Sequence, residues 1–557
     1  MSDDTSNATA GATRHFVQIG DQTVHYRVQG QGPVVVMLHD SPRSSRLHVP
    51  TMQRLSDQFT LVALDTPGYG SSSPLDKATP TIEDFADSLN AALCALGIER
   101  APLYAPHTGA KIALEYAAKY GHPVRLILDG LSIPPKPTAP EFIDAYMRPF
   151  IKDSAGAFIA TEWTHVRDMT RWFPWFNRST ATRIALEPTA EWLHDYTLDL
   201  FSAGPHYSGA YAAAMRYPPL PALRKVSVPT LVGAREDDVL YSSLPRVPVN
   251  ENPNLAIEPL PADTETWFGW LRTRFAEACD IAAVSFSPPT SDLGPKTYVE
   301  GPAGQVLVHR TGQAGGTPLL ILDAPTTLHA LHLASLVPET IRTLVPELPG
   351  FGESGPLDAP DAEGFVATLS SIIDSLADGK VDVFATGLSV PLALALAIAH
   401  PGKVGRLILD GGLSEQAQPA ASEVDRLLPE IAFSSAGAHL MQAWHMLRDA
   451  EASWPWFDNA IPAQRQIEPL LDVDHLYEPF LGILKQPRNY GDAARAALAA
   501  SVPLSSVSQP CFVFSHDSDR AYLGTEEAAA SLPNATIAPR PPRIEDAVPA
   551  LLGFLGA

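Results

Sequence analysis

The sequence predicts an α/β protein made of two similar domains in tandem, and three observations lead to that prediction. The chain has 557 residues, more than one hydrophobic core usually supports. Its two halves repeat the same segments. Within each half, short apolar runs alternate with amphipathic helical stretches, as in a parallel sheet covered by helices.

The repeat shows as a nearly constant offset between matching segments. Trp163 falls on Trp444 at an offset of 444 − 163 = 281, and the hexapeptide RLILDG occurs at 125–130 and again at 406–411. We therefore predict duplicated domains over residues 15–280 and 297–557. A linker over 281–296 joins them, because its Ser-Pro-Pro-Thr-Ser core and Gly-Pro step favour extended chain. Such fusions commonly derive from a symmetric homodimer, so we expect an intramolecular pseudo-dimer and leave further homo-oligomerisation open.

The elements of the first half follow in order. Its apolar runs predict strands over residues 34–38, 59–65, 101–105, 124–130 and 228–234. A long helical stretch, about residues 141–224, separates the last two strands and is predicted to form a cap over the strand ends. The second half repeats this pattern, with its own cap at about residues 420–503.

Composition excludes several classes of function. The net charge is 39 − 62 = −23, which repels nucleic acids and anionic membrane surfaces. The three cysteines lack metal-ligand spacing, and we expect neither a metal nor an organic cofactor. The start MSDDTSNATAGATR lacks the basic and apolar regions of a signal peptide, and no long apolar run predicts a membrane span. We expect a cytoplasmic protein that binds a small-molecule substrate.

Three segments of the first half carry a family resemblance. LHDSPRSS at 38–45 resembles a His-Gly oxyanion loop, and DTPGYGSS at 65–72 resembles an Asp-x-Pro-Gly-x-Gly-x-Ser turn. A strand, a sharp turn and a helix follow at 105–120, where a nucleophile elbow belongs. In this order the segments resemble the α/β-hydrolase superfamily. The resemblance implies two α/β-hydrolase-fold domains, each a mostly parallel sheet flanked by helices with a helical cap.

The elbow departs from the usual Gly-x-Ser-x-Gly pattern. Aligning that pattern places His107 at the nucleophile position of the first half and Gly387 at that of the second. Registers with Thr108 or Ser389 as the nucleophile are rejected, because the count of residues from elbow to helix end agrees only for His107 and Gly387. The first half is also similar to a subgroup with a His-Thr-Gly elbow, which implies that the histidine is a feature of the site and not decay.

A Ser-His-Asp triad is missing from both halves. The loop after the strand at 228–234 offers Asp237 and Asp238 as the acid, but no histidine follows the last strand. His107 is therefore the candidate general base or, as an alternative, the nucleophile, with Asp237 or Asp238 orienting it. A neutral imidazole there can take a proton near pH 7.

Further residues are expected around His107. The backbone N–H of Thr108 and one from the Asp40–Ser41 loop would form an oxyanion hole. His39 is a second catalytic candidate, and its alternative role is to orient the first loop. Substrate contacts are expected from the side chains of Arg43, Trp163 and Trp267.

The second half lacks the polar positions of the first. His39, Arg43 and His107 correspond to Leu322, Thr326 and Gly387. This pattern predicts a degenerate second domain that is retained for packing.

Together these observations predict an enzyme of the α/β-hydrolase superfamily that acts on a small carbonyl compound by acid–base catalysis at His107. Hydrolysis is the reaction the fold suggests, and lyase, isomerase or cyclase chemistry fits the missing serine better. The alternative is a catalytically dead pseudo-hydrolase that serves as a small-molecule-binding or scaffold protein.

Overall fold

The structure is a computed structural model that describes residues 11–184, 188–281, 283–289, 294–313, 315, 317–413 and 420–556. The chain divides into two compact units. The first unit comprises the residues up to Ile151 together with Glu162–Gly294, and the second comprises Lys152–Thr161 together with Pro295–Ala557. The break after Gly294 falls inside the predicted linker, of which residues 282 and 290–293 lie outside the described residues.

The segment Lys152–Thr161 differs from the predicted domain boundaries. The sequence places it in the first domain, but in the structure it groups with the second unit. Phe158 packs edge to face on Trp444 with ring centroids 5.4 Å apart, and Lys152 Nζ lies 2.7 Å from Asp474 Oδ1. Aromatic packing of this kind is not visible in a sequence pattern.

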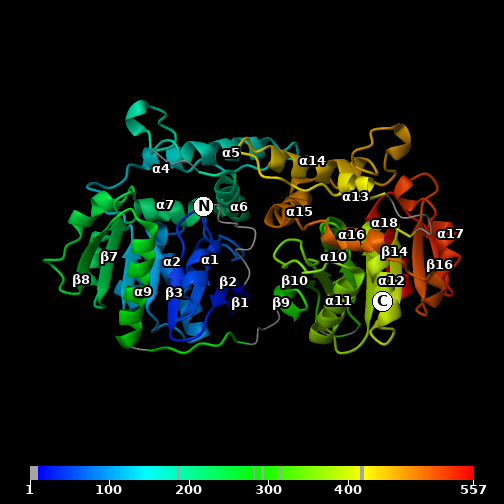
Figure 1. Ribbon diagram of the computed structural model, residues 1–557, viewed down its shortest axis with the longest axis horizontal. Coiled ribbons are helices and arrows are strands. Elements are labelled where there is room, and N and C mark those ends of the chain that lie inside the picture. Colours follow the sequence, from blue (N-terminus) through cyan, green and yellow to red (C-terminus); the bar gives the residue numbers. More distant parts are fainter. Residues whose placement is uncertain are drawn as a thin grey trace. The chain divides into compact units, whose positions relative to one another are not determined.

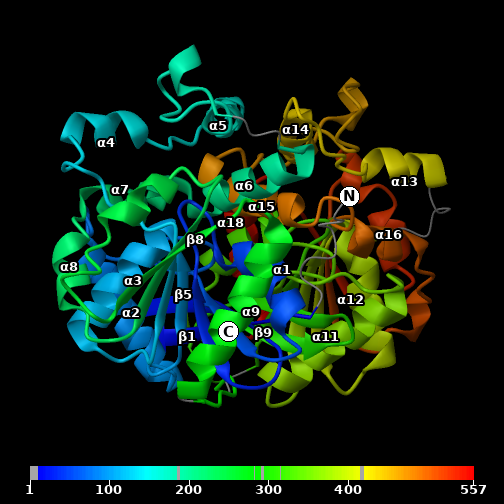
Figure 2. The same ribbon diagram turned by 60° about the vertical axis from the view of Figure 1, so that its left-hand side comes forward.

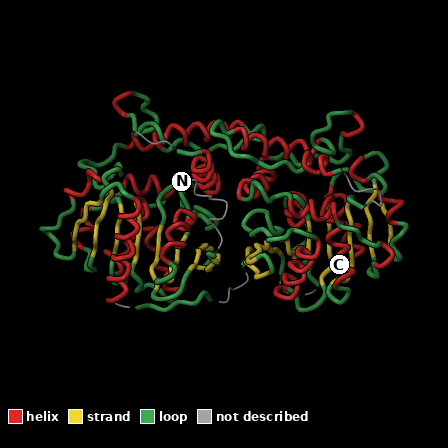
Figure 3. Tube along the Cα trace, in the orientation of Figure 1, coloured by secondary structure: helices red, strands yellow, loops and turns green. Residues whose placement is uncertain are grey.

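The first unit contains an eight-stranded sheet in the order β1-β2-β4-β3-β5-β6-β7-β8 (Figure 3). β1 pairs antiparallel with β2, and β2 antiparallel with β4, whereas the remaining pairs are parallel. The five predicted strands are present, and the sequence analysis missed β1, β2 and β8. The strands are β1 (Thr13–Ile19), β2 (Gln22–Gln29), β3 (Val34–Leu38), β4 (Thr60–Leu64), β5 (Leu103–Pro106), β6 (Leu126–Asp129), β7 (Thr230–Arg235) and β8 (Leu255–Leu260).

Helices cover both faces of this sheet (Figure 2). On one face, α1 (Val49–Leu55) and α9 (Thr264–Ile281) form a core with the strands, in which Met52, Leu271 and Phe275 pack on Val35 and Met37. On the other face, α2 (Ile82–Leu96), α3 (His107–Tyr120) and α8 (Leu220–Lys225) pack side by side. Both faces are therefore closed, and strands such as β3 are buried along their whole length.

Between β6 and β7 the chain forms a helical insert, here defined as residues 140–216, of which residues 152–161 group with the second unit (Figure 1). Its helices are α4 (Pro140–Tyr146), α5 (Ala157–Met169), α6 (Ala190–Ala203) and α7 (Ser208–Arg216). The insert agrees closely in extent with the helical stretch that the sequence predicts.

The second unit repeats this topology with the strand order β9-β10-β12-β11-β13-β14-β15-β16. Its strands are β9 (Lys296–Gly301), β10 (Gly304–Thr311), β11 (Leu319–Leu322), β12 (Thr343–Pro346), β13 (Val381–Thr386), β14 (Val404–Asp410), β15 (Cys511–Ser515) and β16 (Ala535–Pro539). Its helices are α10 (Leu328–Leu336), α11 (Ala362–Leu376), α12 (Val390–Ala399), α13 (Ala421–Leu427), α14 (Ala438–Ala452), α15 (Val473–Lys485), α16 (Asp492–Ala499), α17 (Thr525–Ala529) and α18 (Ile544–Leu555). The two mixed, mostly parallel sheets flanked by helices confirm the α/β prediction.

Candidate active site

The turn between β5 and α3 forces His107 into an unusual backbone conformation. His107 has a φ of 44° and is the sole non-glycine residue with positive φ in the described part of the chain. The left-handed region costs an L-residue about 1–2 kcal/mol, and such strain gathers at functional sites. At the corresponding turn of the second unit, between β13 and the short helix Gly387–Ser389, Gly387 has a φ of 52°.

His107 pairs with Asp238 of the loop after β7. Its Nε2 lies 2.7 Å from Asp238 Oδ2, and the His107 side chain remains 35% exposed. Asp238 Oδ1 accepts the backbone N–H of Leu240 at 2.7 Å, which fixes the carboxylate. Asp237 instead binds Arg235 through both carboxylate oxygens and is half exposed. Of the two predicted acids, Asp238 is the one that contacts the histidine.

The charge of this pair differs from the expectation of a neutral base. Burial by itself would lower the pKa of His107, but the hydrogen bond and charge of Asp238, with smaller effects of Asp40 and Asp129, raise it to about 9. Near pH 7 the ring is therefore an imidazolium whose Nε2–H donates to Asp238. No described group bonds to its other nitrogen, Nδ1. The arrangement provides a charged proton donor on a side chain that is 35% exposed.

Asp129, at the end of β6, is a site residue that the sequence analysis missed. Its Oδ2 accepts hydrogen bonds from Tyr104 Oη at 3.0 Å and from Trp267 Nε1 at 2.8 Å. Burial raises the pKa of Asp129. The indole of Trp267 is thus bonded to the carboxylate of Asp129, and the predicted contact of Trp267 with substrate is not supported. The signal for Asp129 was present in RLILDG, which ends the same strand in both halves.

His39 positions a loop and has no ring nitrogen left for catalysis. Its Nδ1 donates to the Asp40 carbonyl at 2.7 Å, and its Nε2 accepts the Thr66 N–H at 2.9 Å. The side chain is 1% exposed. The predicted catalytic role for His39 is therefore wrong, and its alternative role in orienting the first loop agrees with these contacts.

Arg43 is also committed to the protein. Its Nε donates to Asp199 Oδ2 at 2.7 Å, and its Nη2 contacts Asp195, so it ties the first loop to α6. Burial lowers the pKa of Arg43, but Asp195 and Asp199 outweigh this effect and raise it. A buried guanidinium with two carboxylate partners is not available to a substrate carboxylate, which corrects the sequence-based expectation.

Asp40, Ser41 and Thr108 lie at the predicted oxyanion region. Asp40 is close enough for its charge to raise the pKa of His107, and its buried Oδ1 has no hydrogen-bond partner among the described residues. Ser41 is 7% exposed. Thr108 is the second residue of α3, so its N–H lacks an intrahelical acceptor and can serve an oxyanion.

Trp163 is a packing residue of α5. It is 4% exposed, and on the same helix His165 contacts Trp175 with ring centroids 4.4 Å apart and ring planes tilted by 54°. A buried indole of this kind supports the helical insert, and the predicted contact of Trp163 with substrate is not supported.

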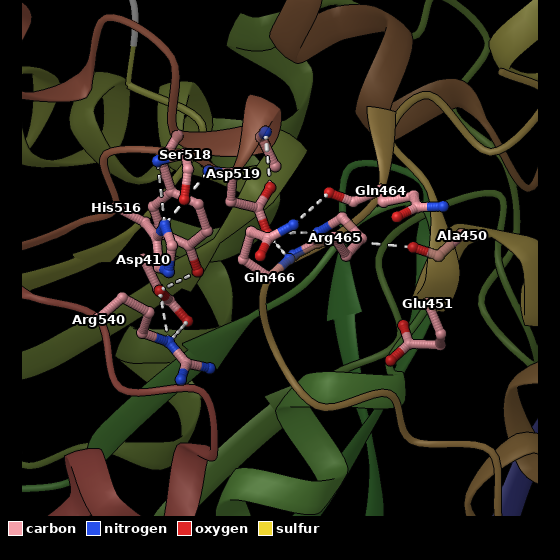
Figure 4. Close-up of polar contacts among 12 residues, drawn as sticks. Asp410, Ala450, Glu451, Gln464, Arg465, Gln466, His516, Ser518, Asp519 and Arg540 are labelled. Atoms are coloured by element: carbon pink, nitrogen blue, oxygen red, sulfur yellow. Dashed lines mark hydrogen bonds and ion pairs between the residues drawn. The ribbon is translucent and has the colours of Figure 1, made fainter. Parts of the chain in front are cut away.

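The second unit holds a cavity of about 910 Å³ above Gly387. Charged pairs meet at its wall: His329 Nε2 lies 2.9 Å from Glu451 Oε1, Arg465 Nε lies 3.1 Å from Asp519 Oδ2, and Arg540 Nε lies 3.0 Å from Asp410 Oδ1. Figure 4 shows the last two pairs with Glu451 beside them. The expectation that polar groups converge only in the first half is therefore wrong. Sequence comparison at fixed offsets missed two of these pairs, because Arg465 and Arg540 correspond to Ile184 and Pro259 of the first half.

The described residues hold neither a metal-binding cluster nor a membrane-spanning helix. No cluster of His, Cys, Asp or Glu side chains there could hold a metal ion. Within the same residues, no helix is both long and apolar enough to cross a membrane.

Comparison with known proteins identifies the fold of the first unit. Residues 33–238 match the family model described as alpha/beta hydrolase fold. The chain is 35% identical over 123 residues to 2-(acetamidomethylene)succinate hydrolase of Mesorhizobium japonicum, covering 21% of this chain and 43% of that protein. It is 31% identical over 114 residues to fluoroacetate dehalogenase of a Burkholderia species, covering 19% and 38%. The match thus spans less than half of the length of either relative.

Solved structures include similar chains. The crystal structure of E-2-(acetamidomethylene)succinate hydrolase aligns with 48% of this chain and 99% of its own, at 21% identity and a TM-score of 0.35. Residues 33–238 of the first unit match the model of the alpha/beta hydrolase fold, which supports that fold for this part of the chain. Its named relatives are a hydrolase and a dehalogenase, which favours an enzyme.

Proposed function

We propose that the first unit is an α/β-hydrolase-superfamily enzyme that acts on a small carbonyl compound through His107 and Asp238, without an organic cofactor. One observation carries the proposal: a histidine on the strained turn pairs with a carboxylate at 2.7 Å while 35% of its side chain stays exposed. Strain and a perturbed pKa at one accessible residue are typical of catalytic sites.

In this proposal His107 is the acid. Its Nδ1–H donates to the carbonyl oxygen of the substrate, and the N–H of Thr108 assists from the start of α3. As negative charge develops on that oxygen, the imidazolium stabilises it and can transfer its proton. One such donor is worth about 3 kcal/mol of barrier in enzymes generally. Asp238 keeps the ring charged and fixes its orientation.

Asp40 is the complementary base. Its Oδ1 is buried and unpartnered among the described residues, and its charge acts on His107. A carboxylate and an imidazolium facing one substrate can remove a proton next to a carbonyl and protonate the oxygen. These two transfers give an enol. In an isomerase Asp40 then returns its proton to another carbon and His107 takes back the proton of the hydroxyl; in a lyase the enol expels a leaving group from the next carbon as His107 takes back that proton. Hydrolysis would use the same pair, with Asp40 activating a water molecule, and the names of the relatives favour it.

We infer further that the two units arose by tandem duplication and that the helical insert caps the site. The identical strand orders support the first inference, as do Asp129 and Asp410 at the ends of corresponding strands. Arg43 supports the second, because it joins the first loop to α6 of the insert. A second candidate function, small-molecule binding without chemistry, is favoured by the cavity of the second unit.

The test is a panel of small esters, lactones, amides and β-keto acids assayed with the wild-type chain and with His107→Ala. We expect turnover of at least one compound and a loss of two to four orders of magnitude in the variant, as for a general acid or base. Arg178→Met is the control, because Arg178 pairs with Asp168 on the insert surface and is 57% exposed. Turnover that is unchanged in His107→Ala would refute the assignment.

A further inference from the structure

In the cavity of the second unit, Gly387 leaves no side chain at the turn where the first unit has His107. A Cβ built on Gly387 would meet no atom within 4 Å. The cavity volume of about 910 Å³ lies in the range of small-molecule sites. Without a side chain on this turn, the cavity has no nucleophile or acid at the usual position. Polar contacts to a ligand must therefore come from other residues that line it.

The cation that faces the loop carboxylate comes from a different place in each unit. Asp238 and Asp519 follow the corresponding strands β7 and β15, and the partner of Asp238 is His107 on the turn. The partner of Asp519 is Arg465, which lies 465 − 184 = 281 residues after Ile184 of the first insert. The isolated bridges Trp172–Arg183 and Ser453–Gln464 place these two segments in the same register. Both units thus pair this carboxylate with a cation. In the first unit the cation is His107 on the turn after β5, and in the second it is Arg465, which follows the bridge Ser453–Gln464.

The carboxylates next to Arg465 and His329 are already bonded within the protein. Asp323, which also lines the cavity, accepts the backbone N–H of His329 through Oδ2 at 2.9 Å, and burial raises its pKa to about 6. Both oxygens of Asp519 accept hydrogen bonds, from Arg465, Gln466 N and Ala521 N. Both oxygens of Glu451 accept as well, from His329 and from Leu470 N. The carboxylates of the wall therefore have little capacity left to bind a ligand that donates hydrogen bonds.

Two cationic side chains of the lining each keep one nitrogen to which no described group bonds. Arg465 uses Nε for Asp519 and Nη1 for the Ala450 carbonyl at 3.4 Å, and its Nη2 has no partner among the described residues. His329 gives Nε2 to Glu451, and no described group bonds to its Nδ1. Burial lowers the pKa of His329, but Glu451 outweighs burial and raises it to about 9, so the ring is charged near pH 7. Arg465 contacts the carbonyl of Ala450 and His329 contacts the side chain of the next residue, Glu451, so the two cations line the same part of the cavity.

The rest of the lining is apolar and aromatic. The aromatic lining consists of Trp454, Trp456 and Phe457, which belong to the corresponding insert of the second unit between β14 and β15. Ile467 and Ile483 add aliphatic surface. Such a lining takes an apolar body, and a few polar groups then fix its orientation.

We propose that this cavity binds a small organic carboxylate with an aromatic or alkyl body, whose carboxylate is held between Arg465 and His329. The Nη2 of Arg465, which has no partner among the described residues, donates to one carboxylate oxygen, and Nδ1–H of the protonated His329 donates to the other. The apolar part of the ligand lies against Trp454 and Trp456. This site stands whether or not the first unit is catalytic, because none of its residues belongs to the site of His107.

The proposal is tested by calorimetric titration of the full chain with phenylacetate and 3-phenylpropionate, and with the matching amides. We expect saturable binding of the acids and binding of the amides weakened about tenfold or more, since a charge-assisted hydrogen bond is lost. Arg465→Met and His329→Gln should each weaken binding of the acids about tenfold. Arg178→Met and His107→Gln, both in the first unit, should leave it unchanged.

Removing Arg465 leaves the buried Asp519 without its cation, so the variant could fail to fold. Arg465→Lys keeps a cation for Asp519 but removes the separate nitrogen Nη2 that reaches the ligand. This variant should fold and still weaken binding, and circular dichroism checks the fold of each variant. The proposal is overturned if the amides bind as tightly as the acids. It is also overturned if folded Arg465 and His329 variants bind normally, or if no acid binds saturably up to about 10 mM. Loss of binding in His107→Gln alone would assign the ligand to the first unit.

Discussion

The substitution Asp238→Asn isolates the electrostatic role of the pair in the first unit. Asparagine keeps an oxygen that can accept from His107 Nε2 but removes the charge. The pKa of His107 is about 9 against an ordinary 6.5, and each unit corresponds to 1.36 kcal/mol, so the full shift amounts to about 3.4 kcal/mol. Because the side chain is 35% exposed, solvent screening reduces this to about 1–2 kcal/mol. We therefore expect the pKa of His107 to fall by about one unit or more.

The assay is an NMR titration of the histidine Cε1–H signals, in which the signal lost in His107→Gln identifies His107. The free energy of unfolding gives a second measure. A pKa raised on folding contributes stability fully below pH 6.5 and loses it as the pH rises to about 9. The stability advantage of the wild type over Asp238→Asn should thus be largest near pH 6 and shrink toward pH 9. A wild-type pKa near 6.5, or one that Asp238→Asn leaves unchanged, would refute the reasoning.

Three further predictions concern other residues. Gly387→Ala should lower the free energy of unfolding by about 1–2 kcal/mol, measured by urea denaturation, because φ is 52° and the new Cβ meets no atom; an unchanged midpoint would contradict this. Fluorophosphonate probes should not label the chain, because the hydroxyl of the buried Ser389 donates to the Leu322 carbonyl at 2.8 Å; a stoichiometric adduct at Ser389 by mass spectrometry would show that it is a nucleophile. Binding of phenylacetate in the second unit should weaken as the pH rises through about 9, where His329 loses its proton; affinity that increases over that range would speak against a role for His329.

Much of the fold follows from the sequence, because period and spacing record it. The apolar runs at 34–38 and 228–234 are strands in the structure, since buried parallel strands consist of continuous apolar residues. The edge strands β1 and β8 were missed. In β8 buried and exposed residues do not alternate regularly, because four of its six residues are at least partly exposed. A strand of this kind gives no strong pattern in the sequence.

The candidate site was predicted less completely. Alignment of the turn identified His107, and the loop after β7 limited its partner to Asp237 or Asp238. The sequence could not choose between them, because that choice depends on Arg235, which binds Asp237. His39 and Arg43 are polar residues in a catalytic-type loop, and only their contacts in space show that they are structural. The sequence did not indicate a role for Arg465 for a related reason. Arg465 stands where the first half has Ile184, and its partner Asp519 is 54 residues away.

The pH dependence of kcat/KM for a compound that the first unit turns over tests the central claim most directly. If the His107 imidazolium is the acid, kcat/KM should fall as the pH rises through about 9, and the midpoint should move to lower pH in Asp238→Asn. A rate that instead rises through pH 6.5 to a plateau above pH 9, as for a neutral imidazole base, would contradict the account.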